Sequence, residues 1–149
     1  MTPNAKPSEH MALLATLDSA SQAAGAVSTG YVDIKNFHAL LALIDVGAFG
    51  ASATVDAKLQ QAQTSGGANV KDVTGKAITQ LLAAGGNNRQ ALINLKAADL
   101  DTEGGFEFVR LTVTVGTAAT QLSAALFGCF PRFEDAGAAF NQAGVAQVV

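Results

Sequence analysis

Short runs of β-type residues, each ended by turn residues, recur along most of this 149-residue chain. The clearest run covers 52–63, where alanine, valine and leucine alternate with threonine, aspartate, lysine and glutamine. A period of two places one set of side chains on a core and the other in water, so this stretch predicts a half-buried strand. Residues 106–115 alternate in the same way, with an aliphatic face opposite a face that is aromatic and then threonine-rich.

The remaining runs with strand composition are less regular, and lie at 16–21, 31–34, 38–49, 70–81, 90–100 and 119–130. The run at 38–49 is apolar nearly throughout, which predicts a buried strand, and Gly75 falls where a strand would kink or bulge. No convincing helix of about ten or more residues separates these runs, so a βαβ fold is not indicated. We therefore predict an all-β, antiparallel, jelly-roll-like sandwich or barrel of about eight strands, with flexible N- and C-terminal arms.

The two ends of the chain set the expected domain boundaries at 1–15 for an N-terminal arm, 16–133 for the β-sandwich domain and 134–149 for a C-terminal arm. Met11, Leu14 and Leu17 are spaced as on one face of a short helix with Ser8 as a cap, although an extended arm fits equally well. The stretch 18–30 reads as a loop or a weak edge segment. The tail after Phe133 is either a disordered terminus or an arm that adds to a neighbouring subunit.

Composition narrows the classes of function. The net charge is −3 and the nine basic residues are spread along the chain, which argues against nucleic acid as a partner. The N-terminus has no apolar signal segment and no run of about 18 apolar residues occurs, so we expect a soluble protein made in the cytosol with no membrane partner. Cys129 is the single cysteine, which excludes an intrachain disulfide, and we expect it reduced and buried.

The histidines and the acidic cluster are the first candidates for chemistry. His10 lies in a proline-containing arm and His38 begins an apolar run, so each has a structural or surface role unless partners converge on it. Asp99, Asp101 and Glu103 supply only part of the pattern of a calcium loop, and a solvated turn is the favoured interpretation.

Nucleophile and phosphate motifs are also incomplete. Ser123 stands in QLSAA, which is not a GxSxG elbow. The glycine-containing stretch 66–76 lacks the order of residues found in a phosphate-binding loop. We therefore assign no catalytic, cofactor-binding or metal-binding residue, expect no cofactor, and predict that the chain is not an enzyme. The predicted core consists of Phe37, Leu40, Leu43, Val55, Leu59, Ile78, Ile93, Phe108, Leu111, Val113 and Leu126.

A resemblance to a known group of proteins extends over about residues 16–133. Its marks are FHALLALI, ATVDAKLQQA, GKAITQL and VRLTVTVGTA, followed by Pro131 and Arg132. Through these strand and turn patterns the chain resembles small proteins that tailed phages and prophages encode beside the major capsid protein. The resemblance implies a capsid decoration, or cement, protein of jelly-roll type that binds the outside of the shell and clamps neighbouring capsomers.

The same resemblance implies the partners and the location. The partners would be the major capsid protein and the chain itself, as a dimer or trimer, and the location would be the exterior of a virion capsid after synthesis in the host cytoplasm. The group has no catalytic residues to transfer. A surface of small, weakly charged side chains fits such a role, because these side chains lose little rotamer entropy when a contact orders them.

Two other functions remain open at this level. One is another virion component, such as a tail-tube, neck or head-fibre-base protein, since these are also small oligomeric β domains. The other is a carbohydrate-binding β-sandwich, which usually presents aromatic platforms. This chain has no tryptophan, one tyrosine and eight phenylalanines, most of them in runs predicted to be core.

Overall fold

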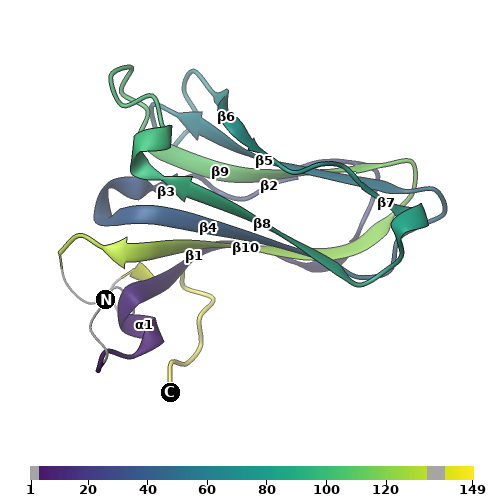
Figure 1. The fold of residues 1–149 in the computed structure, drawn as a ribbon, viewed down its shortest axis with the longest axis horizontal. Helices are drawn as coiled ribbons and strands as arrows, with labels where there is room; N and C mark the ends of the chain where they lie inside the picture. Colours follow the sequence, from purple (N-terminus) through teal and green to yellow (C-terminus); the bar gives the residue numbers. More distant parts are fainter. Residues whose placement is uncertain (1–3, 134–139) are drawn as a thin grey trace.

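Two antiparallel β-sheets packed face to face make up the computed structural model, which describes residues 4–133 and 140–149 (Figure 1). The first sheet, called sheet A here, has the order β1 (Met11–Gln22), β10 (Thr120–Pro131), β4 (Phe37–Val46) and β8 (Arg89–Lys96). Sheet B has the order β2 (Gly25–Ser28), β9 (Phe108–Gly116), β5 (Thr54–Ala62) and β6 (Lys71–Ala77). Two short strands complete sheet B, β3 (Val32–Asp33) beside β9 and β7 (Leu81–Leu82) beside β5.

The strands pair in the order of a long hairpin that has been wrapped around itself. β1 pairs with β10, β2 and β3 pair with β9, β4 pairs with β8, and β5 pairs with β6 and β7. Successive pairs belong alternately to sheet A and sheet B. This is the topology of a jelly roll, so the predicted fold class is confirmed.

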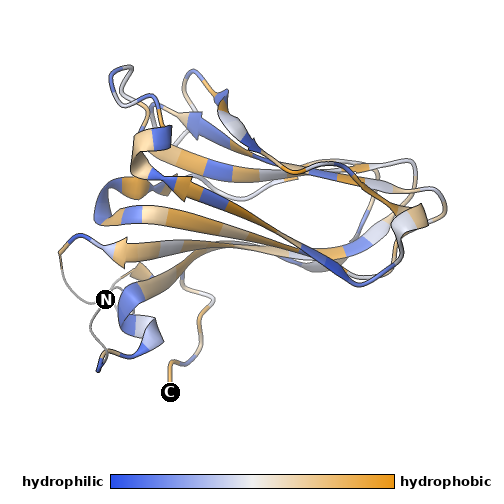
Figure 2. Ribbon diagram, viewed as in Figure 1, coloured by the Kyte–Doolittle hydropathy of each residue, from blue (hydrophilic) through white to orange (hydrophobic). Residues whose placement is uncertain are grey.

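The core lies between the sheets and follows the period of two along each strand (Figure 2). In β9 the aliphatic residues Val109, Leu111 and Val113 point inward and are fully buried, as the alternation predicts. Most of the predicted core is confirmed, but the predictions for three residues were wrong. Leu43 and Phe108 are half-buried on the outward side of their strands, and Ile78, which follows the end of β6, is also half-buried.

The N-terminal segment forms a short helix and then a strand. Helix α1 spans Pro7–His10, and β1 begins at Met11, inside the stretch assigned to the arm. Register shifts after Leu13 and after Leu17 let residues with helix-like spacing lie in an extended chain. Of the two alternatives for 11–17, a helix or an extended segment, the extended one is present. The stretch 18–30, predicted as a loop or weak edge segment, contains the end of β1 and the edge strand β2.

Local predictions about turns are confirmed in two places. Gly75 has a φ of 74°, which favours glycine, and lies where the pairing of β5 with β6 shifts register. The end of the 90–100 run turns into the 3-10 helix η3 (Ala97–Asp99). Two more 3-10 helices, η1 (Ile34–Asn36) and η2 (Ala83–Gly85), follow β3 and β7.

The described part of the C-terminal segment lies against β1. The Leu13 N–H donates to the Asn141 side chain at 2.8 Å, and the Gln142 N–H donates to the Leu13 carbonyl at 2.7 Å. The Phe140 ring meets the Phe37 ring edge-on, with centroids 5.5 Å apart. The tail therefore covers part of the free edge of β1. Residues 1–3 and 134–139 of the predicted arms lie outside the described residues.

Candidate functional site

The outward surfaces of the two sheets differ in chemistry. On sheet B, β5 presents Asp56, Lys58 and Gln60, and β9 presents Arg110, Thr112 and Thr114 beside them. These six side chains, with Ser28 of β2, define what we call the polar face. Ser28, Gln60, Arg110 and Thr112 are hydrogen-bonded to one another, while Asp56 and Lys58 bond to Gln80 and Asp72 at the edge of the sheet.

Gln60 is the centre of the polar face. Its side-chain oxygen accepts hydrogen bonds from Arg110 Nε at 3.0 Å, from Arg110 Nη2 at 2.9 Å and from the Thr112 hydroxyl at 3.0 Å. Its amide nitrogen donates to Asp72 at 2.8 Å, and the Lys58 ammonium lies 2.9 Å from the same carboxylate. The Lys58 and Gln60 hydrogen bonds hold the pKa of Asp72 below its ordinary value.

The outward surface of sheet A carries aliphatic and aromatic side chains at matching register positions. In three adjacent strands, Phe127 pairs with Leu41 and Leu41 with Asn94, while Ala125 pairs with Leu43 and Leu43 with Leu92. We call this surface the apolar face; it comprises Met11, Leu13, Ala39, Leu41, Leu43, Leu92, Ala125, Phe127 and Cys129.

Strand β4 explains why the sequence is apolar throughout 38–49. Its even-numbered side chains from Leu40 to Val46 fill the core, and Ala39, Leu41 and Leu43 point outward. Strands that read as continuous apolar runs are typically covered on both sides. In this chain the core covers one side only, and Leu92 on the other side is 59% exposed. An apolar patch of this kind on a sheet surface indicates contact with another protein.

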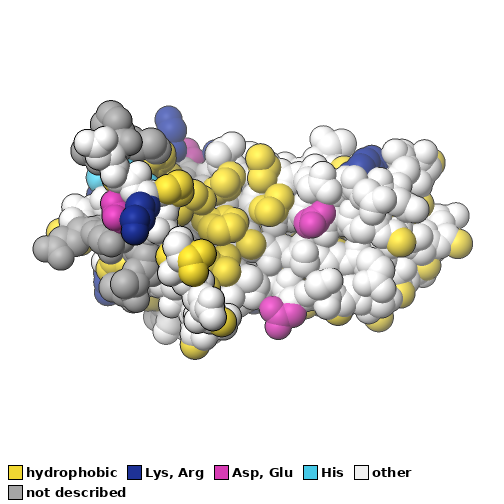
Figure 3. Space-filling model, turned by 90° about the horizontal axis from the view of Figure 1, so that it is seen from below, with side chains coloured by type: hydrophobic (Ala, Val, Ile, Leu, Met, Phe, Trp, Pro, Cys, Tyr) yellow, Lys and Arg dark blue, Asp and Glu magenta, His cyan; other side chains and the backbone are white. Residues whose placement is uncertain are grey.

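Charged groups are confined to the two ends of the apolar face. Lys96 lies at one end, where it pairs with Ala39, and Asp45 lies at the other, where it pairs with Gln90. Asp18 and Asp45 border the same shallow depression as Leu43. Figure 3 shows the hydrophobic patch with acidic side chains beyond it on one side, and basic and acidic side chains together on the other. The face therefore has a basic end, an apolar centre and an acidic end.

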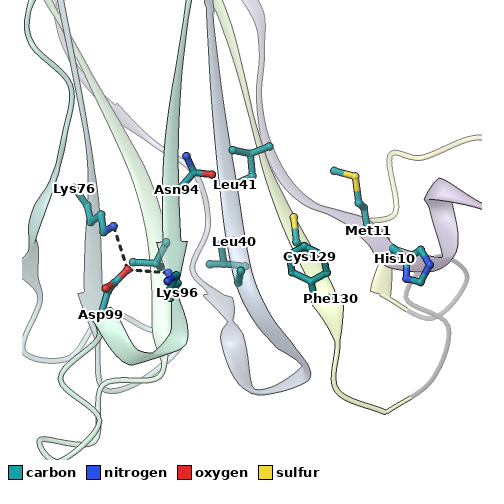
Figure 4. A pocket seen from close by; sticks show the side chains of 12 residues that line it. His10, Met11, Leu40, Leu41, Lys76, Asn94, Lys96, Asp99, Cys129 and Phe130 are labelled. Atoms are coloured by element: carbon teal, nitrogen blue, oxygen red, sulfur yellow. Dashed lines mark hydrogen bonds and ion pairs between the residues drawn. The ribbon is translucent and has the colours of Figure 1, made fainter. Parts of the chain in front are cut away.

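A groove with a volume of about 620 Å³ opens at the basic end of the apolar face. Met11, Leu41, Cys129 and Phe130 supply its apolar lining, and Lys76, Lys96 and Asp99 stand along one side (Figure 4). Lys76 and Asp99 form an ion pair at 3.1 Å. The Lys96 ammonium makes no ion pair with another described residue.

The acidic residues considered as a calcium loop are held apart by different partners. Asp99 accepts from the Lys96 N–H at 2.8 Å and pairs with Lys76, and these contacts lower its pKa. Asp101 pairs with Lys71 at 2.5 Å and accepts from the Gly104 N–H at 2.9 Å, which lowers its pKa. Glu103 is exposed in the turn between them and β9. The two aspartates thus stabilise a turn, in agreement with the favoured interpretation.

The other candidates lie at separate places. His10 lines the groove from the end of α1, and its Nε2 is buried without a hydrogen-bond partner among the described residues. His38 is exposed, and Ser123 points outward near the acidic end of the apolar face. Cys129 is a free thiol but only half-buried, contrary to expectation, because it points outward into the groove; burial still raises its pKa.

Metal-binding and membrane-spanning features can be assessed for residues 4–133 and 140–149. No group of three or more His, Cys, Asp or Glu side chains converges there in a way that suits a metal ion. No helix in that part of the chain is long and apolar enough to cross a membrane. The single tyrosine, Tyr31, has the Arg110 guanidinium over its ring at 5.0 Å, so this ring is not an open stacking platform.

Comparisons with known proteins give similarities of structure only. No protein-family model and no curated protein matches the chain in sequence. A chain of the cryo-EM structure of Broad Bean Stain Virus has a TM-score of 0.48 and 8% identity, with 87% of this chain and 90% of that chain covered. A chain of naturally occurring empty particles of the Cowpea mosaic virus top component has a TM-score of 0.41 and 9% identity, with 87% and 92% covered. These scores are too low to assign a function to this chain.

Sequence reasoning did not find the apolar face, although its signal was present. The apolar composition of 38–49 predicts a buried strand, but only one side of β4 packs inside the molecule. The other side carries Leu43, and Leu92 lies beside it because β8 pairs with β4. That pairing is not readable from a local pattern.

Proposed function

We propose that the chain is a structural virion protein, a decoration or cement protein that binds the outer surface of a tailed-phage capsid and clamps neighbouring capsomers. The observation that carries the proposal is the contrast between the uncovered apolar face of sheet A and the hydrogen-bonded polar face of sheet B. A domain with this contrast is built to place one side against protein and the other in water. The resemblance in the strand and turn motifs supplies the identity of the partner.

The proposed action needs no chemistry. A protein that binds the assembled shell but not its dissociated subunits stabilises the shell by RT ln(1 + [L]/Kd) per site, which is about 2.7 kcal/mol when its free concentration is 100 times Kd. Many such sites together resist the pressure of packaged DNA. In this proposal the chain is made in the host cytoplasm, is located on the capsid exterior, and has the major capsid protein and itself as partners. It uses no cofactor, nucleic acid or membrane and is not an enzyme.

The terminal segments are part of the proposal. We assign 16–133 to the sandwich domain, and 1–15 and 134–149 to arms that add contacts. The described end of the C-terminal arm binds β1 of its own chain through Asn141 and Gln142. The same backbone groups of an edge strand are those that a strand of a neighbouring subunit would use.

Binding to pre-formed shells tests the proposal. Purified protein is added to expanded capsid shells that lack it, and bound protein is measured by co-sedimentation. We expect saturable binding at a stoichiometry set by the symmetry axes of the shell, a higher melting temperature of the loaded shell, and no binding to unassembled major capsid protein. Absence of co-sedimentation at micromolar concentrations would contradict a decoration role.

Matched variants show whether the apolar face is required. Leu92→Asp places a charge on the β8 side of the apolar face, where Leu92 is 59% exposed, and we expect shell binding to weaken at least about tenfold. Thr114→Asp is the control, because Thr114 is also exposed but lies on the polar face of sheet B, away from both ends of the sandwich. Equal binding by the two variants would exclude the apolar face from the interaction.

A further inference from the structure

The apolar face is complementary to itself, and we infer that its occupant is a second copy of the chain in a two-fold dimer. The inference rests on the proposed function, because it names the molecule that covers the apolar face on which that proposal depends. It starts from the charges: a basic end at Lys96 and an acidic end at Asp45 are separated by six residues along β4, or about 20 Å. A surface with opposite charges at its two ends suits a partner that presents the same surface in the reverse direction.

The position of the two-fold axis follows from the register. In a two-fold contact the same patch is used on both copies, so residue i meets residue j and j meets i. We place the axis midway between the two apolar faces, perpendicular to the strands and level with Ala42 and Ile93. Rotation about it brings Lys96 of one copy over the end of the other copy that carries Gln90 and Asp45. The Gln90 amide already donates to Asp45 at 2.9 Å, so the two residues form one polar end.

The same axis also matches the shapes of the apolar side chains. Phe127 is level with Leu41, and Ala125 is level with Leu43. Reversal about Ala42 therefore places Phe127 of one copy over Ala125 of the other, a large side chain over a small one, and Leu41 over Leu43. In β8 it places Leu92 over Asn94. Sheets pack face to face when large and small side chains interdigitate in this way.

The area of the face is sufficient for a specific contact. The ten residues of β4 extend about 33 Å, and β10, β4 and β8 together are about 14 Å wide, which gives roughly 450–500 Å² per copy. Part of β1, where Met11 and Leu13 point outward, adds to this. The total for two copies is about 1,000 Å² or slightly more, which is the smallest size of a biological interface and the size of a weak, reversible one.

The dimer gives the clamp its symmetry. Because the axis runs across the strands, the two sandwiches point in opposite directions, and each end of the dimer presents one copy of the η3 end and one copy of the η2 end. Two equivalent sets of loops at opposite ends are what contact with two equivalent capsomers requires. The polar face of each copy points away from the contact and remains in water.

Sedimentation equilibrium of the purified full chain, without any shell, tests the inference. We expect a mass of about 30 kDa, twice the 15.1 kDa of one chain. Leu92→Asp should raise the dissociation constant of the dimer at least about 100-fold, because a buried unpaired charge is costly, whereas Leu82→Asp should leave it unchanged. A protein that stays monomeric at about 100 μM, where even a contact of about −5.5 kcal/mol would be half-formed, would overturn it, as would a trimer. So would a dimer unaffected by Leu92→Asp.

A charge exchange tests the predicted direction of the two copies. Lys96→Asp and Asp45→Lys should each weaken the dimer about tenfold, because each places like charges opposite one another, and the double variant should restore the affinity to within about threefold. Lys35→Asp is the control for loss of a cation, because Lys35 is exposed in η1, outside the apolar face. If the double variant does not recover the dimer affinity, the antiparallel arrangement of the two copies is wrong. If the protein is a monomer that still binds shells, the proposed function stands and the shell, not a second copy, covers the apolar face.

Discussion

Replacement of Leu111 by alanine is expected to lower the free energy of unfolding by about 3–5 kcal/mol. Leu111 lies in the middle of β9, between β2 and β5, and is fully buried against the aliphatic side chains of sheet A. Removal of a buried leucine side chain loses its transfer free energy and leaves a cavity that rigid sheets fill poorly. Urea denaturation followed by circular dichroism measures the difference.

The matched control for this substitution is Leu82→Ala. Leu82 is also a strand residue, but it is 48% exposed at the end of sheet B. We expect its replacement to cost about 1 kcal/mol or less, as for surface substitutions in general. A loss for Leu111→Ala as small as that for Leu82→Ala would contradict the burial of the Leu111 side of β9 between the sheets.

Replacement of Phe37 by alanine is expected to have an effect of similar size, about 3–5 kcal/mol, for a different reason. Phe37 is 1% exposed and forms a second small cluster with Ala12 and Phe140. Its ring lies directly on Gly128, where a Cβ atom would be 2.7 Å from the ring, so no other side chain fills this space. Its loss leaves a cavity and also removes one of the contacts that hold the C-terminal tail on β1.

Two readouts distinguish these contributions. Urea denaturation gives the loss of stability, and hydrogen exchange at the Gln142 N–H, which donates to the Leu13 carbonyl, reports release of the tail. Phe133→Ala is the control, because Phe133 is 76% exposed. If Phe37→Ala is as stable as Phe133→Ala and the Gln142 amide stays protected, the second cluster does not exist as described.

Much of the fold was predictable because alternation reports directly on a buried face. The runs at 52–63 and 106–115 became β5 and β9, and their inward residues are the ones that the period of two selects. Gly75 was readable as a bulge for a similar local reason, since a positive φ favours glycine. Each of these predictions needs only neighbours in sequence.

The errors occurred where tertiary pairing decides. Leu43 was expected in the core because it belongs to an apolar run, yet its pairing with Leu92 and Ala125 places it on the outward side. Phe108 was predicted in the core together with Leu111, although the alternation of 106–115 puts the two residues on opposite faces. The helix-like spacing of Met11, Leu14 and Leu17 is accommodated by two bulges, which local spacing does not reveal.

The candidate site was less predictable than the fold. A search of the sequence for reactive residues identified acids and histidines that the structure places in turns, in separate ion pairs or alone. The feature that carries the proposal is instead an arrangement of ordinary apolar residues from β1, β10, β4 and β8. These residues are far apart in the sequence, and only the order of strands in sheet A brings them onto one surface.

The number of copies of this chain in purified particles tests the central claim most directly. If the proposal is correct, the particles to purify are those of a tailed phage, and the chain is quantified in them by mass spectrometry against the major capsid protein. We predict a ratio near one to one, or a simple fraction fixed by the icosahedral axes. A few copies per particle would place the chain in the neck or tail, and absence from particles would contradict a structural role in the virion.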